Sequence, residues 1–276
     1  MATVMPEVFF LPAATGQRLC VHFPARGPLR GRIVFVHALG EEMNKSRRMV
    51  SLQARSLSEA GYAVLSIDLL GCGDSSGDFG DATWSAWIDD VTLACGWLRR
   101  AADAPLWLWG MRAGALLAVD AASQLDEDCR FLFWQPAVSG RVLLQQFLRF
   151  KAAGDMAEGR AAAVMADLRQ RLDAGEAVDI AGYTLSPQLA QGLERAQLTP
   201  PPRARQVEWI EVSARSDGQL TPAAVKSIDA WRHAGCSVRG HVVNAPPFWQ
   251  TIDIEDAPAL LDTTLAAMAA REAVAQ

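Results

Sequence analysis

The stretch LWLWGMRAGALLA, residues 106–118, decides the fold. Its first four residues are large and apolar and predict a buried strand, whereas the small and aliphatic residues at its end predict a helix. Gly110 and Gly114 frame the turn between the two, and Arg112 lies midway between these glycines. A strand that turns directly into a helix is the repeating unit of a parallel sheet.

The same alternation extends in both directions along the chain. Predicted strands cover residues 18–23, 31–37, 62–68, 106–109, 130–134, 206–212 and 237–243. Predicted helices cover residues 46–60, 84–100, 113–123 and 222–234, and a last one begins near residue 256. This order predicts an α/β fold whose mostly parallel sheet has helices on both faces.

Residues 139–204 interrupt the alternation. Helical patterns at 141–151 and 158–172 are followed by polar loops that end in TPPPR at 199–203. We therefore expect one core built from residues 1–138 and 205–276, with 139–204 inserted as a helical cap over a cleft around Arg112.

Composition excludes several classes of function. The chain has 276 residues, half of them apolar, which is enough for one large core. Its formal net charge of −5 gives no basic footprint, so we expect no nucleic-acid partner. It has no long apolar segment and its first ten residues lack the pattern of a signal peptide, so we expect no membrane span and a cytoplasmic location.

Cysteines and histidines give no sign of a metal or cofactor. The five cysteines show no CxxC spacing and the four histidines are dispersed, so we expect reduced thiols, no metal and no cofactor. The sequence leaves the oligomeric state open.

Three segments, in the right order, resemble the α/β-hydrolase superfamily. Residues 36–40 (VHALG) resemble the loop that offers a backbone amide to the oxyanion, and residues 68–77 (DLLGCGDSSG) resemble a turn of the same superfamily. Residues 110–114 (GMRAG) lie where the nucleophile elbow GxSxG belongs. The resemblance implies an α/β-hydrolase fold with an eight-strand, mostly parallel sheet.

Two segments resemble a narrower group, the proteins called exosortase A system-associated hydrolase 2. They are WGMRAGALLA at 109–118 and APPFWQTIDIEDAPALL at 245–261. That resemblance implies a place in a bacterial exopolysaccharide locus that also encodes exosortase, and the word hydrolase in the group's name is an inference from fold.

The residues required for serine catalysis are replaced at two separate positions. Arg112 stands where the serine nucleophile belongs, and a guanidinium stays protonated and cannot attack a carbonyl. The loop after the last strand, where the histidine base belongs, reads NAPPFW, with Pro247 within it. No histidine follows His241, which falls inside a predicted strand. We therefore expect a pseudoenzyme rather than a serine hydrolase.

Asp217 matches the third triad position, the acid that orients the histidine. Without a histidine, it either shapes its loop or pairs with Arg112. An arginine at a helix N-terminus requires an anion. Asp217, Glu41 or Glu42 can supply it internally, or a ligand carboxylate or phosphate can bind there. A catalytic electrostatic role for Arg112 is the remaining alternative.

The other residues expected around the cleft belong to the loop before Glu42, to the elbow and to the loop after the last strand: His37, Leu39, Glu41, Met111, Phe248 and Trp249. We interpret His37 as a structural member of its loop. Two hypotheses of function follow. The first is a non-catalytic homologue that binds a small anionic or acyl ligand, or a partner. The second is a hydrolase or acyl transferase acting on an ester or thioester, with a rearranged, non-covalent site in which His37, Glu41, Glu42 or Asp217 activates water.

Overall fold

The computed structural model describes residues 5–154, 161–215, 218–251, 253 and 255–269. The strands of its main sheet are β1 (Glu7–Pro12), β2 (Gln17–Phe23), β3 (Gly31–Val36), β4 (Tyr62–Ile67), β5 (Leu106–Met111), β6 (Cys129–Trp134), β9 (Ala204–Ser213) and β10 (Ser237–Asn244). Within the described residues these eight strands are ordered β1-β2-β4-β3-β5-β6-β9-β10. The pairs from β4 to β10 are parallel, and β1 and β2 form an antiparallel edge. The predicted eight-strand, mostly parallel sheet is confirmed.

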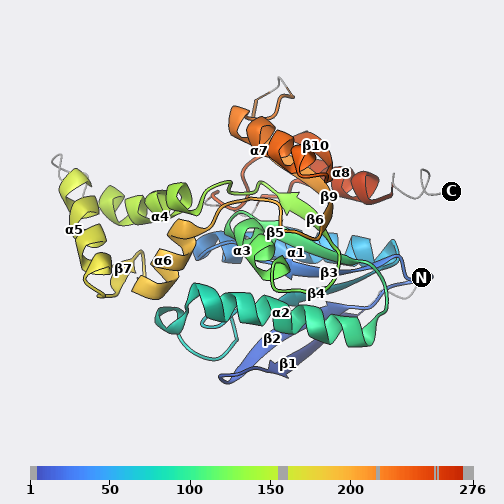
Figure 1. The fold of residues 1–276 in the computed structure, drawn as a ribbon, viewed down its shortest axis with the longest axis horizontal. Coiled ribbons are helices and arrows are strands. Elements are labelled where there is room, and N and C mark those ends of the chain that lie inside the picture. The colour runs from blue at the N-terminus through green and yellow to red at the C-terminus, as the bar shows by residue number, and fades with distance from the viewer. Residues whose placement is uncertain (1–4, 155–160, 216–217, 252, 254, 270–276) are drawn as a thin grey trace.

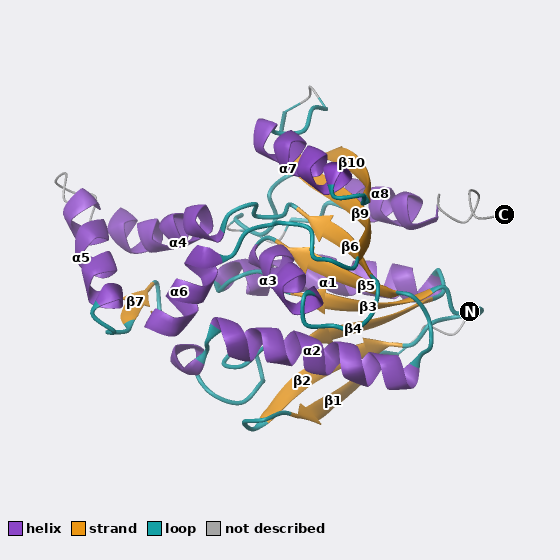
Figure 2. Ribbon diagram, in the orientation of Figure 1, coloured by secondary structure: helices purple, strands orange, loops and turns teal. Residues whose placement is uncertain are grey.

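Helices cover both faces of the sheet. They are α1 (Glu41–Glu59), α2 (Trp84–Ala101), α3 (Ala113–Ala122), α7 (Pro222–His233) and α8 (Pro258–Ala269). Residues of α1 and α8 pack in one apolar cluster with one face of the sheet, and residues of α2, α3 and α7 pack in a second cluster on the other face. Figure 1 shows α2 and α3 in front of the strands, and Figure 2 shows the strands enclosed between the two helical layers.

Burial on both faces explains the sequence of the central strands. Every residue of β3 and of β5 is buried, so neither strand shows the alternation of apolar and polar residues that a half-exposed strand has. The register places Val36 beside Gly110 and Met111 beside Trp134, so the chain leaves β3, β5 and β6 at the same edge of the sheet. Ligand sites of open α/β sheets lie at this carboxyl edge.

The segment between β6 and β9 contains α4 (Gly140–Gly154), α5 (Ala161–Asp173), β7 (Val178–Ile180), β8 (Tyr183–Leu185) and α6 (Pro187–Arg195). It extends beyond the sheet at the left of Figure 1. The two helices expected here are present in the described residues, and residues 158–160 of the second expected helix lie outside them. The prediction of polar loops after residue 172 is wrong, because β7 and β8 form an antiparallel hairpin there and α6 follows it. Ser186 caps the start of α6 and Pro187 follows it, which is a helix-start signal in the sequence.

Two further elements differ from expectation. The edge strand β1 was not predicted from its mixed sequence EVFFLP. Helix α1 begins at Glu41 rather than near Ser46, since Gly40 turns the chain with a φ of 56° and two glutamates occupy the first turn. Negative side chains stabilise that end of a helix.

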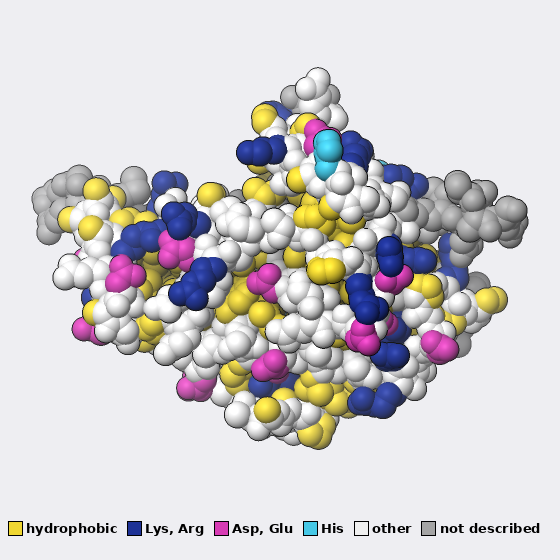
Figure 3. Space-filling model, in the orientation of Figure 1, with side chains coloured by type: hydrophobic (Ala, Val, Ile, Leu, Met, Phe, Trp, Pro, Cys, Tyr) yellow, Lys and Arg dark blue, Asp and Glu magenta, His cyan; other side chains and the backbone are white. Residues whose placement is uncertain are grey.

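The surface is mixed in charge. On the face shown in Figure 3, basic and acidic side chains are interspersed. No helix among the described residues is long and apolar enough to cross a membrane.

Candidate functional site

The turn between β5 and α3 has an unusual backbone. Arg112 adopts φ 54° and ψ −116°, a conformation that side-chain-bearing residues rarely occupy. A Cβ atom on Gly110 would lie 2.5 Å from the Cα of Ala115, and one on Gly114 would lie 2.1 Å from the carbonyl oxygen of Val36. Both glycines are therefore required for β3, β5 and α3 to approach this closely.

The side chain of Arg112 forms an ion pair with Glu42 of α1. Its Nε donates to Glu42 Oε1 at 3.3 Å and to Oε2 at 3.2 Å, and its Nη2 donates to Oε1 at 3.2 Å. Each side chain is only 13% exposed. Glu42 is thus the internal anion among the alternatives that the sequence left open.

Three further side chains surround this pair. Arg112 Nη2 donates to Oε1 of Gln146 on α4 at 3.5 Å, and Nε2 of Gln250 donates to Glu42 Oε1 at 3.3 Å. The guanidinium carbon of Arg112 lies 6.0 Å from the ring centre of Trp249, within the range of a cation–π contact. The pair therefore links the elbow, α1, α4 and the loop after β10.

Both ring nitrogens of His37 bind backbone groups, and Glu41 and Glu42 are not among its hydrogen-bond partners within the described residues. Its Nδ1 donates to the Ala38 carbonyl at 2.7 Å, and its Nε2 accepts the backbone N–H of Leu69 at 3.4 Å, which requires the neutral ring. Burial lowers the pKa of the imidazole below its ordinary 6.5. His37 lines a separate cavity of about 200 Å³ beneath α1.

Glu41 binds the inserted segment instead. It accepts the hydroxyl of Tyr183 from β8 at 3.1 Å and the side-chain amide of Asn44 at 3.2 Å. Burial, followed by the contact with Glu41, raises the pKa of Tyr183 to about 12, so its hydroxyl stays protonated and donates.

The structure describes the loop where the triad's base belongs, but not the residue at the position of the triad's acid. Asp217, the expected acid, lies outside the described residues. In the loop after β10, Phe248 and Trp249 are buried and Pro247 is exposed. His241 lies in β10, where its Nε2 is 2.9 Å from the buried carboxylate of Glu208.

Two cavities meet at Arg112, and together they form the cleft. The first, called the apolar arm, has a volume of about 610 Å³, and no histidine lines it among the described residues. Its apolar lining consists of Leu39, Leu143, Phe147, Phe150, Ala181, Tyr183 and Trp249. The second, called the polar arm, has a volume of about 470 Å³ and also lacks a histidine in the described part of its lining. Its polar lining includes Gln135, Glu211, Ser213, Gln219 and Thr221.

The polar arm contains an acid that the sequence analysis missed. Glu211 is buried on β9, and its carboxylate accepts the backbone N–H of Thr221 at 2.7 Å and the Thr221 hydroxyl at 2.9 Å. The sequence could have indicated Glu211, because this residue lies near the end of a predicted strand, at the edge of the sheet where ligands bind. These bonds join β9 to the start of α7.

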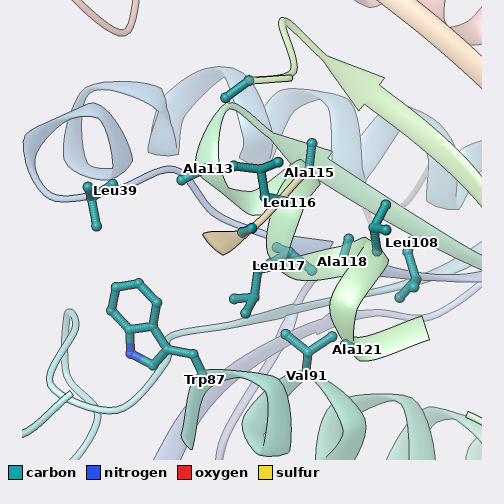
Figure 4. Close-up of a cluster of buried hydrophobic side chains, with 14 of the residues drawn as sticks. Leu39, Trp87, Val91, Leu108, Ala113, Ala115, Leu116, Leu117, Ala118 and Ala121 are labelled. Atoms are coloured by element: carbon teal, nitrogen blue, oxygen red, sulfur yellow. The ribbon is translucent and has the colours of Figure 1, made fainter. Parts of the chain in front are cut away.

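Of the remaining predicted cleft residues, Leu39 lines the apolar arm and Pro247 lines the polar arm. Met111 and Phe248 line neither, because both pack in the apolar cluster beneath α1 and α8. Figure 4 shows Leu39 on its loop and Ala113 where α3 begins. The backbone N–H groups of these two residues have no hydrogen-bond acceptor within the described part of the chain. Two backbone N–H donors without an acceptor in the described part of the chain thus lie on the loop after β3 and at the residue that follows Arg112.

Comparison with known proteins finds one matching family and a relative that matches over part of its length. The sequence model of a family described as serine aminopeptidase, S33, matches residues 27–198. The human protein ABHD12B is 31% identical over 115 residues, which cover 41% of this chain and 30% of that protein. The matched region is therefore less than two thirds of the length of this relative.

Solved structures share the fold over nearly the whole chain. Est1E from Butyrivibrio proteoclasticus has a TM-score of 0.64 at 11% identity and covers 96% of this chain and 99% of its own. A carboxyl esterase from Bacillus coagulans has a TM-score of 0.62 at 13% identity, with coverage of 97% and 98%. A monoglyceride lipase from Saccharomyces cerevisiae has a TM-score of 0.59 at 14% identity, with coverage of 96% and 94%. These likenesses confirm the α/β-hydrolase fold.

Proposed function

The chain belongs to the serine aminopeptidase S33 family, and we propose that it is a non-catalytic member, which binds a ligand in the cleft around Arg112. The observation that carries the proposal is the ion pair between Arg112 and Glu42 at the elbow. Arg112 occupies the position from which a nucleophile would attack, and its positive charge is neutralised by the carboxylate of Glu42.

The loss of the base supports the proposal independently. Arg112 and the loop at 244–249 are far apart in sequence, yet both border the polar arm. Restoring a nucleophile alone would leave no imidazole to accept its proton.

The inserted segment supplies the walls of the binding site in this proposal. We propose that residues 139–204 form the cap, because Leu143, Phe147 and Phe150 of α4 and Tyr183 of β8 line the apolar arm opposite the core. A purely anionic ligand would have to displace Glu42 from Arg112, whereas an acyl or alkyl chain fills the apolar arm without breaking the pair.

The biological setting is the finer part of the proposal. The resemblance of residues 109–118 and 245–261 to exosortase A system-associated hydrolase 2 supports a cytoplasmic role in a bacterial exopolysaccharide and exosortase system. In that setting the protein would carry or sense a ligand, or bind a partner, rather than cleave a bond.

Hydrolysis assays test the proposal. We expect the wild-type protein and Arg112→Ser to release product from short acyl esters and thioesters no faster than the buffer does. Robust esterase activity of Arg112→Ser would show that a base is present, and activity of the wild type would favour a rearranged catalytic site. Near-ultraviolet circular dichroism of both proteins checks that the substitution leaves the fold intact.

A further inference from the structure

The cleft has two arms of different chemistry, which share four lining residues: Arg112, Gln146, Trp249 and Gln250. Phe147 and Phe150 of α4 line the apolar arm, whereas Gln135, which follows β6, lines the polar arm. Arg112 borders both. Both volumes, about 610 and 470 Å³, lie in the range of small-molecule sites. A ligand that reaches from one arm into the other needs an apolar end and a polar end.

Formal charges around Arg112 cancel. The apolar arm is lined by two basic side chains, Lys45 and Arg112, and by two acidic ones, Glu41 and Glu42. In the polar arm, the Glu211 carboxylate already accepts two hydrogen bonds from Thr221. Arg215 also lines the polar arm, so the described lining of the two arms together carries three basic and three acidic side chains. A charged headgroup loses its hydration on entering and finds no surplus of opposite charge among these described residues.

The amide side chains around the polar arm offer both donors and acceptors. Gln135 accepts the N–H of Val212 with its Oε1 at 2.6 Å, which leaves its amide nitrogen to donate. Gln146 uses its Oε1 on Arg112, and Gln250 uses its Nε2 on Glu42. Within the described residues, the nitrogens of Gln135 and Gln146 have no acceptor and the oxygen of Gln250 has no donor.

Hydroxyl groups match this pattern, because each hydroxyl both donates and accepts. The space is available because the loop after β10 places Pro247 and Gln250, rather than an imidazole, along the polar arm. We propose that the cleft binds an uncharged single-chain amphipath, with its alkyl or acyl chain in the apolar arm and a polyhydroxylated headgroup in the polar arm. This inference rests on the proposed function, since it assigns the ligand class of the same site.

Calorimetric titration of the full chain with four probes tests the ligand class. The probes are octyl β-D-glucoside below its micelle concentration, octyl sulfate, 1-octanol and free glucose. We expect octyl glucoside to bind at least about tenfold more tightly than the other three, because only this probe satisfies both arms without a charge. Hexyl glucoside should bind more weakly than octyl glucoside, by about fourfold for each CH₂ group removed.

Variants test the headgroup and the chain of the ligand separately, because Gln146 and Gln250 border both arms but offer the amide groups that only a headgroup would bind. Gln146→Met combined with Gln250→Met should weaken octyl glucoside about tenfold and leave 1-octanol unchanged, whereas Phe150→Ser should weaken both ligands alike. Gln146, Gln250 and Phe150 are exposed, so the fold should tolerate these changes. Gln170→Met on α5, at an exposed position that lines neither arm, is the matched control and should change nothing.

Tighter binding of octyl sulfate than of octyl glucoside, or an unchanged affinity for octyl glucoside in the double glutamine variant, would overturn the inference. Monooctanoylglycerol distinguishes a glycerol headgroup from a sugar and also carries an ester. Release of octanoate from it would refute the non-catalytic function while leaving the ligand class standing, whereas binding of no amphipath would refute the ligand class and leave the absence of serine catalysis untouched.

Discussion

Arg112 combines a strained backbone with a satisfied side chain. A positive φ at a residue with a side chain costs about 1 to 3 kcal/mol. The elbow holds this conformation because Gly110 and Gly114 fix the path of the chain on either side. The fold thus retains the backbone that presents a side chain to the cleft, although the side chain presented is paired with Glu42.

Removing Arg112 should expose the energetic role of the pair. Arg112→Met leaves the Glu42 carboxylate mostly buried without its cation, so we expect the free energy of unfolding to fall by about 2 to 3 kcal/mol. Adding Glu42→Gln should restore part of this loss, since the unpaired charge is then removed. Urea unfolding of the wild type, the two single variants and the double variant measures the coupling. A single Arg112→Met variant as stable as the wild type would show that the pair is not formed.

His37 makes stability depend on pH. Its pKa is lowered in the folded protein, so below pH 6.5 the unfolded chain takes up a proton that the folded protein does not. The stability that the neutral ring contributes is therefore present above pH 6.5 and is lost as the pH falls below it.

Comparison with His37→Asn isolates this contribution. We expect the free energy of unfolding of the variant to be about 2 kcal/mol lower than that of the wild type at pH 7.5, because the N–H of Leu69 loses its acceptor. The deficit should shrink between pH 6.5 and pH 5, where only the wild type loses stability by protonation of this ring. A deficit that grows with acidity would mean that His37 is charged in the folded state.

At the scale of elements, the contact of α3 with β3 depends on a missing side chain. We expect Gly114→Ala to lower the free energy of unfolding by more than about 4 kcal/mol, because the new Cβ would lie 2.1 Å from the carbonyl oxygen of Val36. Gly96→Ala in α2 is the matched control. A Cβ atom at position 96 would have a side-chain nitrogen of Arg100 as its nearest neighbour, at 3.9 Å. The free energy of unfolding of this variant should therefore rise by about 0.5 to 1 kcal/mol. Chemical denaturation of both variants measures the contrast, and equal stabilities would show that α3 does not pack this closely.

The choice between Glu41 and Glu42 shows where prediction from sequence stopped. A helix expected near Ser46 left both glutamates in a loop with no defined direction. With α1 beginning at Glu41, successive side chains are rotated by about 100°, so Glu42 faces Arg112 and Glu41 faces Tyr183. The sequence thus predicted that Arg112 pairs with one of a few acidic residues, and the position at which α1 begins determines that this residue is Glu42.

Prediction was most successful for the core strands and least successful for the inserted segment. Strands such as β3 and β5 consist mostly of large apolar residues and are buried throughout, so local composition determines them. The hairpin of β7 and β8 has only three residues in each strand, and α6 has nine residues. Such short elements are stabilised by packing against distant residues, for example where Ser186 donates to the Ala82 carbonyl beside α2.

At the scale of the whole molecule, fold and chemistry are separable. The sheet and the sharp turn between β5 and α3 are those of an α/β-hydrolase fold. The side chains that would perform serine catalysis are absent at positions 112 and 244–249, which meet in the cleft only through the fold. A scaffold of this kind supports functions other than the one that named its family.

Labelling with a fluorophosphonate tests the central claim most directly. The reagent modifies a serine hydroxyl that a neighbouring base activates, and intact-mass analysis counts the adducts. We predict that the protein remains unmodified under conditions that fully label an active serine esterase used as a control. Stoichiometric addition to a single serine of the native protein, abolished by unfolding, would contradict the account.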